Sequence, residues 1–267
     1  MQPFDPRQPC VSFQPPPRRR ERRRATALHF VEQAGARFVV KSFAALDDGP
    51  GDAARREAHE MAGIEAFRRA GAVALGPAAG PFAEIELEID GAKHRLSHAL
   101  VFPFVDAPTL YDAIAEAKDP LPLLREAGAR IHARHRRADA AEAMHSDGSA
   151  HNVFADWTWF DFCEPHEIGG LRELKAFEAL RFISSVVEVS RPGQARKRIA
   201  AFCEGYADRD VLLLSLDHAR MAEPHMRVRA WSRMIGRPDK LVRYWRGDTR
   251  MFRRVRTWDA LDHALAT

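Results

Sequence analysis

The sequence predicts an α+β protein with two lobes, in which a small antiparallel sheet with one helix precedes a mainly helical lobe. Two pairs of strand signals, near residues 26–43 and 84–105, flank a single helical segment. After residue 108 the apolar residues recur mostly at helical spacing. We therefore place residues 25–105 in an N-terminal lobe and residues 106–267 in a helical lobe, with the seam at Val105–Pro108.

Composition agrees with a folded, water-soluble chain. Hydrophobic residues make up 46% of the 267 residues and charged residues 29%, a balance that is typical of globular proteins. No apolar run approaches the ~20 residues of a membrane-spanning helix, and no secretory signal is present at the N-terminus. The three cysteines, Cys10, Cys163 and Cys203, are too few for a disulfide framework. We therefore expect a reducing, cytoplasmic location.

Charge is distributed unevenly along the chain. Residues 1–24 contain seven Arg and six Pro, which predicts a basic tail or a loosely packed first segment. Residues 218–256 contain twelve Lys or Arg against three acidic residues. Such ends suit an anionic membrane surface or another polyanion, which would place the protein at the inner face of the membrane. The alternative is that these arginines are solvated or pair with the acidic body.

Local patterns predict the elements of the N-terminal lobe. Ala34-Gly35-Ala36 forms a turn between two strands, and Asp90-Gly91 is a strong hairpin signal between two others. The expected elements are strands at Thr26–Glu32 and Arg37–Phe43, a helix at Ala53–Ala70, a strand around Ile85–Ile89 and a return strand at His94–Val105.

Helices dominate the second lobe, interrupted once by a loop and a hairpin at Met144–Asp161. The expected helices cover Thr109–Lys118, Leu121–Arg137, Glu173–Val189, Arg196–Tyr206 and Val211–Met221. The residues whose side chains suit catalysis or metal binding are concentrated in this loop at Met144–Asp161.

That loop contains Asp147 and Asn152, and Asp161 follows nine residues after the asparagine. A tight apolar hairpin at Val153–Phe160 brings Asn152 and Asp161 to adjacent points at its mouth. Amide and carboxylate oxygens are hard ligands suited to Mg²⁺. Asp147 can face the same metal-bound phosphate and accept a proton from a hydroxyl group.

The interval from Asp147 to Asn152, with Asp161-Phe162 after it, resembles the catalytic loop and the metal-binding Asp of the protein-kinase-like superfamily. Ala150-His151-Asn152 is similar to the compact bacterial branch, the Kdo and lipopolysaccharide-core kinases. Aminoglycoside or choline phosphotransferases and RIO-type or KEOPS-associated kinases are near this branch. His-Ser-Asp replaces the His-Arg-Asp of typical protein kinases, and Ala-Pro-Glu is absent.

Upstream residues extend the resemblance over roughly Ala25–Leu216. Phe38-Val39-Val40-Lys41 resembles the Val-Ala-Ile-Lys strand of the family, in which the Lys holds the α- and β-phosphates of ATP. Glu57, on the following helix, would orient Lys41, and Glu60 is a nearby competitor for this role. The backbone near Phe102, Phe104 and Val105 would receive the adenine, where the family has its hinge.

The resemblance therefore implies an ATP-dependent phosphotransferase that uses Mg²⁺. Asn152 and Asp161 would hold the metal, and Asp147 would orient and deprotonate the acceptor hydroxyl. Sugar, lipopolysaccharide-core sugar, antibiotic and protein Ser or Thr hydroxyls all suit the same loop, so the acceptor stays open.

Three alternatives remain beside this interpretation. The first glycine of the chain is Gly35, so a Gly-rich phosphate loop is missing. Arginine residues could replace its phosphate contacts, or the protein could be a pseudokinase that acts as a scaffold or regulatory partner. A nucleic-acid-binding module would use the basic ends, but no recognisable motif supports a specific nucleic acid. His132, His135, His145, Asp147 and His151 could suggest a zinc hydrolase, but the arginines around the helical pair disfavour a cation. We expect His145 instead to hold the loop by bonding to the backbone near Asp161.

Overall fold

The computed structural model describes residues 3–15, 27–43, 50–162, 169–191, 193–232 and 257–266, with the backbone alone at 50–51 and 225–232. The described chain forms two compact units. The first contains the residues up to Ile64 together with Leu75–Asp106, and the second contains Glu65–Ala74, Ala107–Phe162 and the described residues from Gly169 onward. This architecture confirms the predicted α+β class, with a small antiparallel sheet and a mainly helical remainder.

The sheet of the first unit has five strands in the order β1-β2-β3-β5-β4, paired antiparallel throughout. The expected hairpin turns form at positive φ, which glycine adopts without a steric penalty at Gly35 and Gly91. The strands are β1 (Val11–Ser12), β2 (Ala27–Gln33), β3 (Ala36–Ser42), β4 (Ala79–Ile89) and β5 (Ala92–Pro103).

The N-terminal residues 3–15 are part of this sheet unit, whereas the sequence analysis expected a basic tail or a loosely packed first segment over residues 1–24, of which residues 16–24 lie outside the described residues. The Cys10 amide donates to the Glu88 carbonyl at 2.8 Å, and the Cys10 carbonyl accepts from the Asp90 amide at 3.0 Å. The next residues form β1 on the far edge of the sheet, against β2. Residues 10–12 thus bridge both edges and curl the sheet on itself, an arrangement that local composition does not reveal because the partners lie some eighty positions later.

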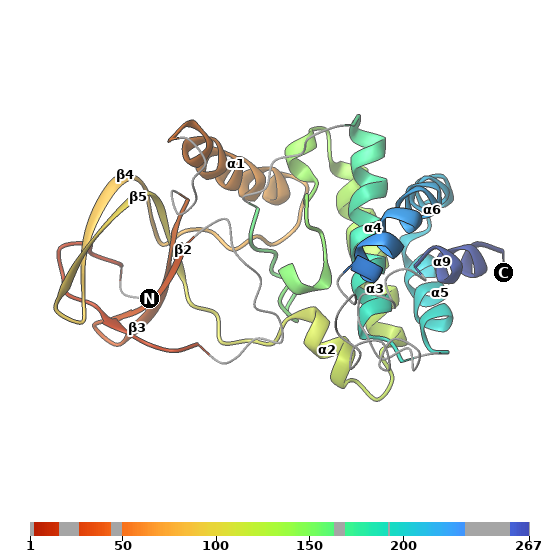
Figure 1. The fold of residues 1–267 in the computed structure, drawn as a ribbon, viewed down its shortest axis with the longest axis horizontal. Helices are drawn as coiled ribbons and strands as arrows, with labels where there is room; N and C mark the ends of the chain where they lie inside the picture. Colours follow the sequence, from red (N-terminus) through yellow and green to blue (C-terminus); the bar gives the residue numbers. More distant parts are fainter. Residues whose placement is uncertain are drawn as a thin grey trace. The chain divides into compact units, whose positions relative to one another are not determined.

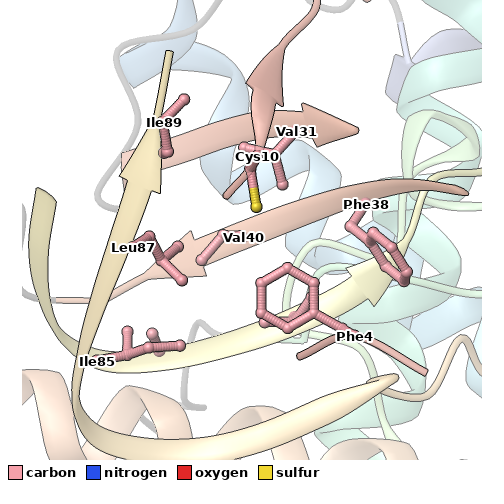
Figure 2. Close-up of a cluster of buried hydrophobic side chains, with 10 residues drawn as sticks. Phe4, Cys10, Val31, Phe38, Val40, Ile85, Leu87 and Ile89 are labelled. Carbon is pink, nitrogen blue, oxygen red and sulfur yellow. The ribbon is translucent and has the colours of Figure 1, made fainter. Parts of the chain in front are cut away.

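Alternating side chains of the strands fill the core of this unit. Phe4 and Cys10 come from the N-terminal segment and point into the same cluster as Phe38 and Leu87, as Figure 2 shows. Leu87 is fully buried, and Phe4 and Cys10 are 6% and 2% exposed. Apolar burial contributes roughly 1.5–3 kcal/mol for each such large side chain, which explains why a proline-rich segment is held here.

Helices make up most of the second unit (Figure 1). The helices are α2 (Leu110–Glu116), α3 (Leu121–Arg137), α4 (Leu171–Val189), α5 (Ala195–Tyr206), α6 (Arg209–Ser232) and α9 (Thr257–Ala266), with short 3₁₀ turns at Ala141–Ala143 and Ala150–Asn152. Helix α1 (Pro50–Arg69) contributes to both units, because its last turn belongs to the second.

Two helical features differ from the sequence prediction. Helix α6 continues past the expected end at Met221 to Ser232 with Pro224 inside it, because a proline removes one backbone hydrogen bond without always ending a helix. Helix α9 was not expected, although Leu261 and Leu265 lie four residues apart on its buried face.

The basic C-terminal region lies largely outside the described residues. We expect the basic residues of this region to form one exposed face that binds an anionic surface, with Tyr244 and Trp245 as anchors, and this stays a prediction. The basic residues are Arg227, Arg229, Arg233, Arg237, Lys240, Arg243 and Arg246. The same holds for the arginine run at residues 18–24. Within the described part of the chain, no helix combines the length and the apolar character needed to cross a membrane.

Candidate functional site

Lys41 lies near the end of β3 with its side chain only 7% exposed. Its Nζ donates to Oε2 of Glu60 on α1 at 2.6 Å, and the Glu60 side chain is 2% exposed. A lysine of this kind keeps its charge only while a carboxylate compensates the loss of solvation. The pair therefore fixes a positive charge at a defined point of the sheet face.

The partner of Lys41 is a correction to the sequence analysis, which assigned the pairing to Glu57. Glu57 instead faces His98 of β5, with Oε2 and Nδ1 3.2 Å apart. Burial raises the pKa of Glu57, and His98 opposes this rise. The two glutamates lie three residues apart, so they share one face of α1, and only the tertiary placement of the helix decides which one meets the lysine.

Apolar side chains surround Lys41 on its face of the sheet. Register pairs Phe30 with Val39 and Val39 with Phe102, and cross-strand partners share a face. Lys41 lies two residues after Val39, so it projects to the same side. Phe30 and Val39 are partly exposed. A planar base can pack on such an apolar strip, and the phosphates attached to it can bind to the neighbouring buried cation.

The segment expected to receive adenine shows mixed features. Phe102 is 7% exposed in β5, while Phe104 and Val105 are partly exposed just after this strand. The Phe104 amide donates to the Arg37 carbonyl at 2.9 Å, so this donor is already engaged. The Phe104 ring packs edge-to-face on Phe13, with centroids 5.0 Å apart. If this segment binds adenine, it must do so through its other backbone groups. This binding remains a prediction.

In the second unit, the loop after Met144 holds Asp147 close to Asn152. The Asn152 Nδ2 donates to the Asp147 carbonyl at 2.8 Å and approaches Asp147 Oδ2 at 3.4 Å. The amide nitrogen is thus turned toward Asp147. The Oδ1 atom of Asn152 is the remaining polar atom of this side chain, with the lone pairs that a hard cation requires.

Asp161 follows the hairpin that leaves this loop. The Phe160 amide donates to the Asn152 carbonyl at 3.1 Å, which brings the residue after Phe160 beside Asn152. Asp161 itself has a φ of 69°, a left-handed conformation that only a few per cent of non-glycine residues adopt. Such a backbone is retained where the surroundings dictate it, and it often marks a functional position.

His145 ties the two ends of this region together. Its Nε2 lies 3.0 Å from the Phe160 carbonyl and its Nδ1 accepts from the Asp147 amide at 3.2 Å. The expectation that His145 holds the loop through backbone bonds near Asp161 is confirmed. Because Nδ1 accepts, Nε2 carries the proton that it gives to Phe160. The ring also packs on Phe162, and Phe162 packs on Phe67 of α1 with centroids 4.7 Å apart.

A buried carboxylate that the sequence analysis did not identify lies beneath the loop. Glu178 of α4 is fully buried and accepts from the His145 amide at 3.1 Å. It also pairs with Arg134 and accepts from His135 Nε2 at 3.1 Å. The sequence offers one signal, which is a glutamate among the apolar residues of a helix that is buried on most sides.

Electrostatics keep this cluster in one protonation state near neutral pH. Burial alone would raise the pKa of Glu178, but the charge of Arg134 and the bond from His135 outweigh it and lower the pKa to about 2. Burial lowers the pKa of His135 to about 4 against the opposing effect of Glu178. His135 is therefore neutral at pH 7, donates from Nε2 to Glu178 and accepts from the Tyr206 hydroxyl at Nδ1, 2.6 Å away.

A zinc site built from histidines receives no support in the described residues. No group of three or more His, Cys, Asp or Glu side chains in this part of the chain is arranged to hold a metal ion. His135 belongs to the Glu178 cluster, and His151 stacks on Tyr111 with ring centroids 3.8 Å apart. His135 and His151 therefore make separate contacts in the second unit.

Comparisons with known proteins found matches among solved structures. No family model matches the sequence, and no curated protein matches it. Among 17 matching chains of solved structures is WaaP in complex with acyl carrier protein, at 17% sequence identity. That alignment covers 72% of this chain and 78% of the other, with a TM-score of 0.44.

Proposed function

We propose that this protein is an ATP-dependent phosphotransferase that moves the γ-phosphoryl group to a hydroxyl acceptor. The observation that supports the proposal is the hairpin between Asn152 and Asp161, in which Asn152 Nδ2 donates to the Asp147 carbonyl and the Phe160 amide donates to the Asn152 carbonyl. The resemblance to the protein-kinase-like superfamily supports the same reaction through the same residues.

Each side chain has a role that its chemistry allows. Lys41, neutralised by Glu60, would bind the α- and β-phosphates. The Asn152 Oδ1 and the Asp161 carboxylate fit Mg²⁺, because both are hard oxygen donors and the Asn152 nitrogen already faces Asp147. Bound Mg²⁺ would neutralise charge that develops on the transferred phosphoryl group.

Asp147 would act on the acceptor. Its amide donates to His145 and its carbonyl accepts from Asn152, so the residue is fixed through its backbone, and its carboxylate would orient an acceptor hydroxyl and accept its proton. Phosphoryl transfer needs little covalent help from the protein, so positioning and charge neutralisation supply most of the rate enhancement. The favoured acceptor class is a sugar hydroxyl, including lipopolysaccharide-core sugars, with protein Ser or Thr next.

A pseudokinase is the second candidate, and one observation favours it. The Phe104 amide is engaged by Arg37, and the rings of Phe13 and Phe30 pack around Phe104. If this cluster replaces the base, the unit is a scaffold rather than a nucleotide-binding site. The missing Gly-rich loop agrees with the same alternative.

One assay separates the two candidates. Purified protein is incubated with Mg²⁺ and γ-labelled ATP, first alone and then with a panel of sugars, lipopolysaccharide-core sugars, aminoglycosides and Ser/Thr peptides. We expect label transfer to one acceptor class and none when EDTA replaces Mg²⁺. Binding of Mg·ATP without transfer to any hydroxyl, including autophosphorylation, favours the scaffold.

A further inference from the structure

One surface of the second unit combines an exposed aliphatic side chain with an aromatic ring and arginines. It lies where the turn after α1, the tip of the Val153–Phe160 hairpin and one face of α3 meet. A single exposed aliphatic residue is ordinary in a folded protein, so the residues around it decide what it signifies. We call this set the Val73 surface, and its members are Arg68, Val73, Arg130, Arg137 and Trp157.

Backbone contacts hold Val73 beside the hairpin. The Val73 carbonyl accepts from the Trp159 amide at 2.9 Å, which brings the hairpin tip with Trp157 alongside this turn. The Arg68 Nη2 donates at 3.1 Å to the carbonyl of Ala74, the residue after Val73. The Val73 side chain is 58% exposed, whereas Trp159 is 5% exposed. Val73 thus projects to solvent from a turn whose backbone is fixed on both sides.

The arginines of α3 border the same turn and hairpin. Arg130 and Arg137 lie about two helical turns apart, so they project from one face of the helix. The Arg130 guanidinium lies over the Trp157 ring, 4.8 Å from its centroid. A Cβ atom at Gly71 would overlap Nη1 of Arg137, so this guanidinium packs against the turn after α1. Apolar and basic groups are therefore neighbours on one surface.

Trp157 has a backbone conformation that is unusual for its size. Its φ is 72°, and a positive φ in a bulky residue is a genuine outlier. Its amide donates to the Phe154 carbonyl at 2.9 Å, and the Phe154 amide donates to the Thr158 carbonyl at 2.9 Å. Glycine is the usual residue at such a left-handed position of a hairpin. A tryptophan retained there at a steric cost often marks a functional position, and its ring is partly exposed.

Two of the three arginines keep an uncompensated charge. Glu126 pairs with Arg130 at 2.8 Å. Among the described residues, no carboxylate lies within ion-pair distance of Arg68 or Arg137, and both side chains are exposed. The Asp156 carboxylate, at the hairpin tip, accepts from a backbone amide of the same turn at 2.9 Å. The surface therefore retains a net positive charge beside its apolar groups.

We propose that the Val73 surface binds an anionic lipid bilayer. Arginines attract acidic headgroups, tryptophan prefers the headgroup level of a bilayer, and an aliphatic side chain enters the boundary of the acyl chains. A nucleic acid would use the arginines and the ring but would leave Val73 in water. The surface contains no residue of the proposed phosphotransfer site or of the basic ends, so the inference is independent of the proposed function.

Co-sedimentation of the full chain with vesicles tests this surface. Wild type should bind vesicles of phosphatidylcholine with about 30% phosphatidylglycerol at least about tenfold more tightly than vesicles of phosphatidylcholine alone. Val73→Asp removes the aliphatic group and adds a negative charge at an exposed position, so it should weaken binding by about tenfold or more. Arg137→Gln should weaken binding by about fivefold, the usual contribution of one basic residue near an anionic surface. Trp157→Gly removes the ring and suits the left-handed backbone, so it should weaken binding while the Tm stays near that of wild type.

Two matched variants locate the effect. Leu213→Asp changes an exposed aliphatic residue of α6, and Arg125→Gln changes an exposed arginine of α3 that pairs with Glu204. Both should bind within about twofold of wild type. The inference is overturned if wild type does not prefer anionic vesicles, or if Val73→Asp binds as tightly as Leu213→Asp and Arg137→Gln as tightly as Arg125→Gln. It is also overturned if wild type binds a single-stranded oligonucleotide but not the vesicles.

Discussion

At the scale of single residues, the chemistry of the proposed site depends on how each charge is held. Lys41 has a buried glutamate as a partner, whereas Asp147 is fixed through its backbone by His145 and Asn152. A residue that is held through its backbone, as Asp147 is, can be changed at its carboxylate with little effect on the fold. Single conservative substitutions are therefore informative here.

Glu60→Gln should weaken Mg·ATP binding by about tenfold or more and should also lower the free energy of unfolding by about 3 kcal/mol, because it removes the carboxylate that compensates the buried charge of Lys41. Glu57→Gln is the matched control, one turn earlier on α1 against a partly exposed histidine. Its effects on both quantities should be several times smaller. Calorimetric titration and urea unfolding measure the two, and a larger effect for Glu57 would return the role to that residue.

Asp147→Asn should lower turnover by roughly 10²-fold or more while the affinity for Mg·ATP stays within about twofold of wild type. The change removes the proton acceptor but preserves size and the backbone bonds of residue 147. Steady-state transfer to whichever acceptor the screen identifies measures turnover. A variant with full turnover would remove this loop from the catalytic site.

At the scale of elements, the loop is positioned by its close packing on α4. A Cβ atom at Gly148 would overlap Cγ of Glu178, so the loop approaches the helix as closely as it does only because residue 148 has no side chain. Glu178 cannot retreat, since Arg134, His135 and the His145 amide hold it. Helix α4 thus determines how far from the helix the loop that contains Asp147 lies.

Gly148→Ala should therefore lower the free energy of unfolding by about 1–3 kcal/mol, the usual cost of overpacking, and should reduce turnover at unchanged Mg·ATP affinity. Gly170→Ala is the matched control. Its added Cβ would meet only the terminal Oε2 of Glu173, which can move aside. If both variants show the same stability and turnover, the loop is not positioned by this contact.

The elements that could be predicted are those whose signals are local. The strand alternation around Ile85–Ile89, the hairpin turns and the helical spacing of α3 all appear within a short window of sequence. The pairing of Cys10 with the strand end near Ile89 could not be predicted, because nothing near Cys10 specifies so distant a partner. Local spacing also could not decide between Glu57 and Glu60, nor could it reveal that Glu178 is buried.

At the scale of the whole molecule, the Glu178 cluster couples stability to pH. Unfolded histidine takes up a proton near pH 6.5, whereas burial delays this in His135 until about pH 4. Between these values the unfolded state binds more protons, so stability must fall as the pH falls from 6.5 toward 4. Glu178, with its lowered pKa, stays ionised in the native state across this window, and its contribution to stability is lost as the pH falls from its ordinary pKa of about 4.5 toward about 2.

His135→Gln should reduce this pH dependence by close to one proton, or about 1 kcal/mol per pH unit near pH 5. Glutamine can donate to Glu178 but does not titrate. Urea unfolding at several pH values between 4 and 7 gives the slope for wild type and variant. An unchanged slope would mean that His135 is protonated in the native state across this range, contrary to the assignment above.

Across the whole chain, we propose that the protein binds Mg·ATP. Calorimetric titration of the full chain with ATP, with and without Mg²⁺, tests this most directly. We predict saturable binding at submillimolar to millimolar ATP that depends on Mg²⁺ and weakens by roughly tenfold or more in Asp161→Asn, which removes a ligand charge. Absence of binding at millimolar Mg·ATP, or binding that neither Mg²⁺ nor Asp161→Asn changes, would mean that the protein has no such nucleotide site.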